Sequence, residues 1–103
     1  MIVEASVLTL AGLLVPDVAW ASAEFMAAHR NETPFEEAPE VCIEVTSPSN
    51  SRRELTEKVD ALLAAGALEV WIVYSRSQRI EVFGPAGLLV RSRFALDLTG
   101  LFD

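Results

Sequence analysis

Residues 41–54 read VCIEVTSPSNSRRE and decide the fold of this chain. The apolar residues of Val41–Thr46 fall on both faces of an extended segment, which is typical of a central strand that is covered on both sides. Ser47–Asn50 follow as a turn. Ser51, with Glu54 three residues later, forms a capping box that starts a helix. The stretch therefore predicts a buried strand, a tight turn and a helix.

Toward the C-terminus, the helix is predicted to continue to Ala65 and to stop at Gly66, a residue suited to the position after a helix end. Four apolar positions at helical spacing form one stripe on it: Leu55, Val59, Leu62 and Leu63. The remaining sequence predicts three strands and a short final helical turn, at residues 70–74, 79–83, 88–91 and 96–102.

Toward the N-terminus, the pattern predicts a hairpin whose strands are Ile2–Leu10 and Leu13–Ala21. Pro16 lies inside the second strand, and because proline cannot donate to a ladder, that strand is at an edge or bulged near this point. Ser22 is suited to cap a short helix that ends near His29. The fold class is therefore α/β (α+β): a curved mixed sheet of about five to six strands, with one main helix packed on it.

Size and composition limit what the chain can be. Its 103 residues suit one domain, and 51% of them are hydrophobic. A chain this small buries a limited share of its apolar surface, so we expect a homodimer or a higher homo-oligomer. No stretch has the roughly 20 apolar residues of a membrane span. The only cysteine, Cys42, excludes a disulfide framework and favours a cytoplasmic location.

Three charged residues depart from the pattern around them. Glu44 lies in a strand that is otherwise apolar, and an ionised carboxylate buried there would need a partner, a metal ion or a proton. Asp17 is also surrounded by apolar neighbours. Lys58 stands about 40° from Leu62 on a helical wheel, at the border of the buried stripe. It can therefore extend along the sheet toward an acidic site.

Two carboxylates on a sheet, with a lysine from the helix converging on them, are suited to cleaving phosphodiester bonds. Carboxylate oxygens hold Mg²⁺, and a lysine stabilises the negative charge that develops during the reaction. Other interpretations stay open: Asp17 as a turn acid beside Pro16, Glu44 as a solvent-facing residue, and Lys58 as the partner of Glu54 in an i,i+4 pair. The catalytic interpretation requires that the two acids lie within about 8–10 Å of each other, because oxygen–Mg²⁺ bonds are only ~2.1 Å long.

Four segments in this order resemble the restriction endonuclease family called Uma-two, within the PD-(D/E)XK nuclease superfamily: VPDVA at 15–19, PEVCIEVTSPSN at 39–50, EK at 57–58 and AGALEVWIV at 65–73. The resemblance implies a restriction-endonuclease-like core. It also implies that Asp17 and Glu44 are ligands of Mg²⁺ or Mn²⁺. Thr46 stands where the superfamily usually has its lysine, and Lys58 matches the lysine that this family takes from the next helix.

The resemblance implies metal-dependent endonuclease activity, with DNA as the partner and Asp17, Glu44 and Lys58 as the catalytic residues. Family members carry a further N-terminal region, so residues 1–103 are expected to form a single truncated domain. The net charge of −7 argues against binding DNA by bulk electrostatics. The alternative function is therefore a catalytically inactive remnant of the nuclease fold that serves as an oligomerisation or regulatory module.

Overall fold

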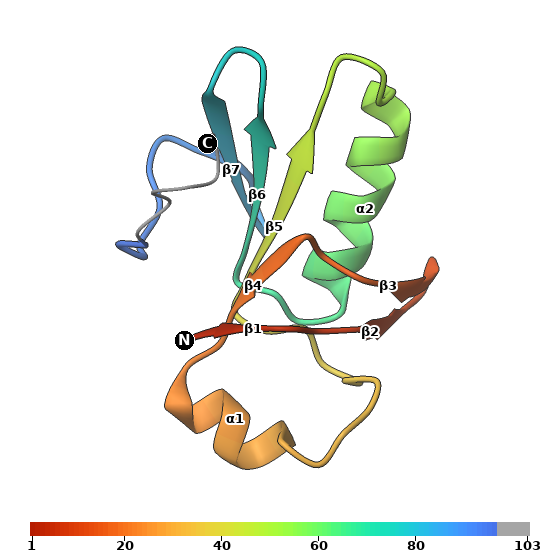
Figure 1. Cartoon of the computed structure of the whole chain (residues 1–103), viewed down its shortest axis with the longest axis vertical. Helices are drawn as coiled ribbons and strands as arrows, with labels where there is room; N and C mark the ends of the chain where they lie inside the picture. The colour runs from red at the N-terminus through yellow and green to blue at the C-terminus, as the bar shows by residue number, and fades with distance from the viewer. Residues whose placement is uncertain (97–103) are drawn as a thin grey trace.

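The computed structural model describes residues 1–96 and contains one six-stranded mixed sheet, a separate two-stranded hairpin and two helices (Figure 1). In spatial order the six strands are β1 (Ile2–Val3), β4 (Val18–Trp20), β5 (Val41–Thr46), β6 (Glu69–Tyr74), β7 (Arg79–Gly84) and β8 (Gly87–Leu89). Only β5 and β6 pair in parallel, and the other neighbours are antiparallel. This architecture confirms the predicted fold class.

The N-terminal hairpin is divided into two parts, so the prediction of two continuous strands is wrong. The outer part is the two-stranded sheet of β2 (Val7–Thr9) and β3 (Gly12–Leu14), while the inner part is the pair of β1 and β4 in the main sheet. Pro16 lies at the division. Since proline has no N–H to donate, the strand breaks there, and β4 continues as an interior strand between β1 and β5.

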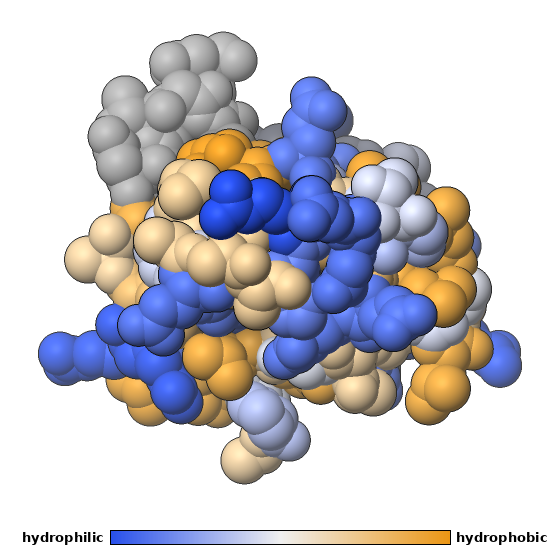
Figure 2. All heavy atoms as spheres, turned by 90° about the horizontal axis from the view of Figure 1, so that it is seen from below, coloured by the Kyte–Doolittle hydropathy of each residue, from blue (hydrophilic) through white to orange (hydrophobic). Residues whose placement is uncertain are grey.

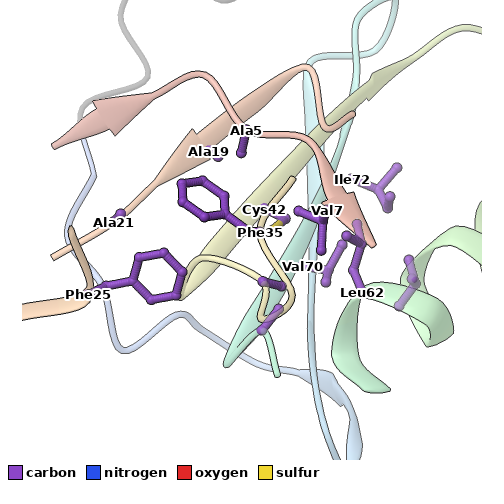
Figure 3. Close-up of a cluster of buried hydrophobic side chains, with 13 residues drawn as sticks. Ala5, Val7, Ala19, Ala21, Phe25, Phe35, Cys42, Leu62, Val70 and Ile72 are labelled. Carbon is purple, nitrogen blue, oxygen red and sulfur yellow. The ribbon is translucent and has the colours of Figure 1, made fainter. Parts of the chain in front are cut away.

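The two faces of β5 enter two separate clusters of buried side chains. Cys42 faces the cluster that also holds Val7 and Leu62, and Figure 3 shows these side chains between the strands and α2 (Arg52–Ala64). Ile43 faces the opposite cluster, together with Trp71. Both faces of the strand are therefore covered, as its sequence predicts. The main helix α2 packs on the face that the even-numbered residues of β5 occupy.

Local signals set the ends of both helices. The Ser22 hydroxyl accepts the N–H of Phe25 at 3.0 Å and starts α1 (Ala23–His29). The Ser51 hydroxyl accepts the N–H of Glu54 at 3.1 Å and starts α2. Gly66 ends α2 with a φ of +112°, a conformation that glycine adopts without strain. These caps fix the length of α2 and thereby the position of each of its side chains over the sheet.

Two further predictions concern the C-terminal part of the chain. The last strand, β8, is found one residue earlier and is shorter than the predicted 88–91. The predicted helical turn at 96–102 falls almost entirely on residues 97–103, which lie outside the described residues. Within residues 1–96, neither helix has the length and apolar character needed to cross a membrane.

Candidate functional site

Glu44 lies in the middle of the sheet on the face that α2 covers. It follows Cys42 by two residues on β5, so both side chains point to the same face. In the parallel ladder it stands opposite Ile72 of β6. Its side chain is only 5% exposed. The solvent-facing interpretation of Glu44 is therefore wrong, and the carboxyl group belongs to a largely desolvated environment.

Asp17 lies directly before β4, and its side chain continues the pairing with β5 where the backbone pairing has ended. The last paired residues are Val18 and Ile43, so Asp17 comes next, on the side of Glu44. Its Oδ2 atom accepts the N–H of Val45 at 2.8 Å, in place of a backbone carbonyl. The interpretation of Asp17 as a turn acid is thus partly right, since it does stabilise the strand end. The same hydrogen bond also fixes its carboxylate beside Glu44.

The charges of Asp17 and Lys58 both act on Glu44. Burial raises the pKa of Glu44 most, the negative charge of Asp17 also raises it, and the positive charge of Lys58 lowers it, which together bring the pKa to about 7. Asp17 accepts the N–H of the residue that directly follows Glu44, so the two carboxyl groups belong to neighbouring positions of the β4–β5 ladder. The structure therefore places the carboxyl group from the loop next to the one from the strand, and the charge of a lysine from the helix acts on Glu44.

Lys58 lies on the exposed flank of α2, and its positive charge acts on Glu44. Within residues 1–96, the ion pairs do not include one between Glu54 and Lys58, and the i,i+4 pair on this helix is Arg53 with Glu57 at 3.4 Å. Lys58 is exposed, so its long side chain is free to move toward Glu44 or toward solvent. Its ammonium group is thus available to a ligand at the carboxylates.

The donor set suits a hard divalent cation. Mg²⁺ is commonly held by one or two carboxylates and keeps several water molecules, which leaves room for a phosphate group. In the described part of the chain, no cluster of three or more histidine, cysteine, aspartate or glutamate side chains is placed to hold a metal ion. A zinc site with four protein ligands therefore does not fit these residues. A largely hydrated Mg²⁺ or Mn²⁺ held by the carboxylates of Asp17 and Glu44 does fit them.

Two neighbours of Glu44 on the same face have structural tasks. The Thr46 hydroxyl donates to Asn50 Oδ1 at 2.7 Å and stabilises the turn before α2. Cys42 is fully buried, and burial together with the charge of Glu44 raises the pKa of its thiol to about 12. The thiol is therefore protonated and unreactive, because the thiolate is the nucleophilic form.

The sequence interpretation missed Glu69, which is completely buried on the other face of the sheet. It accepts hydrogen bonds from Trp71 Nε1 at 2.9 Å, from the Arg93 backbone N–H at 2.9 Å and from the Ser92 hydroxyl. Burial alone would raise the pKa of Glu69, but these hydrogen bonds hold it below the ordinary 4.5. The sequence did contain a signal for this role: Trp71 follows two residues later on the same face of the strand, where its indole N–H can donate to Glu69. Glu69 is remote from Glu44 and has a structural role.

The family model Uma2, with the description "Putative restriction endonuclease", matches residues 4–99 of this chain. A crystal structure of "a putative nuclease belonging to DUF820" from Anabaena variabilis has a similar fold, with a TM-score of 0.68 at 20% sequence identity. The similarity covers 93% of this chain and 57% of the other, so the chain spans little more than half of that relative's length. No curated protein matches the chain at a significant level. Because the family model covers nearly the whole sequence, the chain belongs to the Uma2 restriction endonuclease family.

Proposed function

We propose that the protein hydrolyses DNA phosphodiester bonds with Mg²⁺ or Mn²⁺ held by Asp17 and Glu44, and that Lys58 assists the reaction. The observation that carries this proposal is the burial of Glu44 on the helix side of the sheet, beside Asp17, which is bound to the next residue of the strand, and under the influence of the charge of Lys58. A carboxyl pair in that position is unfavourable when both groups are ionised, and a divalent cation relieves the repulsion. Membership of the Uma2 family supports the same substrate class.

Each of the three residues has a distinct task in this proposal. When bound, the metal ion lowers the pKa of a coordinated water molecule and screens the charge of the attacked phosphate. Glu44 holds the cation from a rigid strand, while the N–H of Val45 keeps Asp17 oriented toward the same point. Lys58 supplies a positive charge and up to three N–H donors for the developing negative charge.

The direct test is the nicking of supercoiled plasmid DNA in the presence of Mn²⁺. We expect activity in the wild type and a loss of at least about 100-fold in Glu44→Gln and in Asp17→Asn, because removing one preorganised electrostatic contact costs about this much. Lys58→Ala is expected to reduce the rate and leave Mn²⁺ binding, measured by titration calorimetry, nearly unchanged. Glu24→Gln, an exposed carboxylate in α1, is the control and should keep full activity.

A second candidate function is an inactive nuclease fold that serves as an oligomerisation or regulatory module. It is favoured by the small number of acidic ligands at the site in the described residues and by the net charge of −7. In that case neither the wild type nor Glu44→Gln would bind Mn²⁺ or change its melting temperature with it. A wild type that binds Mn²⁺ without nicking DNA would separate metal binding from hydrolysis. For either function the expected location is the cytoplasm, where the lone Cys42 thiol stays reduced.

A further inference from the structure

The β2–β3 hairpin exposes an apolar face on the outside of the molecule. Its inner face is buried through Val7, whereas four aliphatic side chains on or next to it are half to almost fully exposed: Leu8 at 51%, Leu10 at 96%, Leu13 at 58% and Val15 at 65%. Figure 2 shows hydrophobic surface along the side on which Figure 1 places this hairpin. Contiguous apolar patches of a few hundred Å² on a soluble protein mark interaction surfaces.

A groove with an apolar floor lies between α2 and the β6–β7 hairpin. It has a volume of about 340 Å³, and its floor consists of Leu55 and Val59 from α2, Ile72 from β6 and Phe83 from β7. We call it the α2–β7 groove. An apolar cavity of roughly 150 Å³ accommodates one benzene molecule. The groove therefore has room for two leucine side chains.

The hairpin of a molecule cannot fill the groove of the same molecule. Val7 of the hairpin packs in one cluster with Leu62, so the hairpin is fixed beside α2. On the helical wheel, Thr56 and Asp60, which line the groove, lie on the flank of α2 opposite to Lys58. Leu62, which shares a cluster with Val7 of the hairpin, lies only about 40° from Lys58, so the hairpin packs on the Lys58 side of the helix. In Figure 1 the tip of the β2–β3 hairpin lies on the side of α2 away from β6 and β7, so a hairpin in the groove comes from another molecule.

Electrostatics favour these two surfaces as a contact between copies. Each copy carries 15 acidic and 8 basic residues, so the net charges of two copies repel each other. Residues 5–16 contain no charged side chain. The charged residues that line the groove balance in sign: Arg52, Arg76, Asp60 and Glu81. A neutral hairpin and a neutral groove on an acidic molecule therefore form a contact without net repulsion.

We propose that the β2–β3 hairpin of one copy inserts Leu10 and Leu13 into the α2–β7 groove of a second copy. The two surfaces differ, so the contact is heterologous, and each molecule offers one hairpin and one groove. Such head-to-tail contacts close into a ring or continue as a chain. This assembly does not depend on the metal site, because the groove lies on the opposite flank of α2.

The test is a complementation experiment with two variants, measured by size-exclusion chromatography with light scattering. Leu10→Asp disables the hairpin, and Thr56→Arg fills the groove without lowering helix propensity. We expect an oligomeric wild type and two monomeric variants with unchanged far-ultraviolet circular dichroism. An equimolar mixture should form a heterodimer, because the hairpin of the Thr56→Arg chain still fits the groove of the Leu10→Asp chain.

The matched controls introduce an aspartate and an arginine at exposed positions outside the two proposed contact surfaces. Val90→Asp changes a fully exposed aliphatic residue outside both surfaces, and Ala64→Arg changes an exposed position at the end of α2. Both should remain oligomeric. A monomeric wild type overturns the proposal. So does a mixture of the two variants that stays monomeric. A Thr56→Arg variant that still assembles also overturns it, since that result points to a contact between hairpins alone.

Discussion

Glu44 combines a favourable position for binding a cation with an unfavourable one for stability. Its carboxyl group is 5% exposed and shares its surroundings with Asp17, so its ionised form is disfavoured in the folded protein. Residues at functional sites often reduce stability, because the same electrostatic environment that prepares them for a ligand is unfavourable without it. Lys58 offsets this only in part, since the pKa of Glu44 stays raised at about 7.

The raised pKa of Glu44 gives a prediction for stability. Between the ordinary value of 4.5 and about 7, the folded protein binds a proton that the unfolded chain has lost, so the free energy of unfolding falls as the pH rises through this window and stays lower above it. Without metal ions, Glu44→Gln should therefore be more stable than the wild type by about 1–3 kcal/mol near pH 8. Below about pH 4.5 the two proteins should be nearly equal.

Urea unfolding of both proteins at the two pH values, in the presence of a chelator, measures this difference. Glu24→Gln, at an exposed position, should have no comparable effect at either pH. A Glu44→Gln variant that is less stable than the wild type near pH 8 would show that the ionised carboxylate is well compensated in the folded state.

Sequence reasoning singled out Asp17, Glu44 and Lys58 as candidates for the site and missed the buried Glu69. Glu44 stands in the middle of an apolar strand, so its neighbours in sequence already indicated that its carboxylate would be buried at a cost in free energy. Glu69 stands at the first position of β6, where a polar residue is equally compatible with an exposed loop before the strand. Two of its partners, Ser92 and Arg93, lie more than 20 residues later in the chain. Local periodicity carries no information about such contacts.

Among the elements, the N-terminal hairpin departs most from its predicted form. The strand pattern of residues 2–21 is continuous in sequence, but Pro16 breaks the ladder and separates β3 from β4. The break has two consequences. It brings Asp17 to the end of β4, where the side chain accepts the N–H of Val45. It also directs β2 and β3 away from the main sheet, which leaves their outer face exposed.

Glu69 attaches the segment after β8 to the opposite face of the sheet. The carboxylate accepts the Arg93 N–H and the Ser92 hydroxyl, and Phe94 beside them packs against Trp20 with ring centroids 5.4 Å apart. A buried carboxylate with several donors stabilises a structure only while all of them are in place, because a lost partner leaves a desolvated charge. The attachment of this segment thus depends on one residue.

We predict that Glu69→Gln lowers the free energy of unfolding near pH 7 by about 1–3 kcal/mol, because the amide cannot accept all three hydrogen bonds. The pKa of Glu69 is lowered, so its contribution is present above the ordinary 4.5 and is lost as the pH falls through the folded value. Acid should therefore destabilise the wild type more than the variant. Trp71 fluorescence during urea unfolding reports the change, since its indole N–H donates to this carboxylate.

Glu57→Gln, on the exposed surface of α2, is the matched control for that experiment and should behave as the wild type. If Glu69→Gln were as stable as the wild type and lost stability in acid to the same extent, the segment after β8 would be held by its apolar contacts alone. Phe94 and Leu96, which pack on the cluster around Trp71, would then carry the attachment.

For the whole molecule, net charge bears on the proposed binding of DNA. Fifteen acidic residues against eight basic ones give a net charge of −7, which opposes the binding of phosphates by bulk electrostatics. Under the proposed function, a divalent cation would therefore serve both the reaction and the contact with the substrate.

We predict that the protein does not bind duplex DNA measurably in chelator at physiological salt, and that Mn²⁺ restores binding. Fluorescence anisotropy of a labelled duplex tests this, with Glu44→Gln as the variant that should not respond to Mn²⁺. Tight binding in chelator with a steep salt dependence would contradict the prediction, because it would reveal contacts of basic residues with the DNA backbone that need no metal ion.

By itself, the sequence determined the strand at 41–46, the capped helix after it and the family of the chain, because these depend on residues close together: an apolar run, a serine cap, a glycine stop and short motifs in order. Only the tertiary structure decided that Asp17 meets Glu44 across the broken ladder, that Glu69 is buried under Ser92 and Arg93, and that the hairpin and the groove lie on opposite flanks of α2. Such contacts follow from strand register and packing between distant segments, on which local periodicity places no constraint.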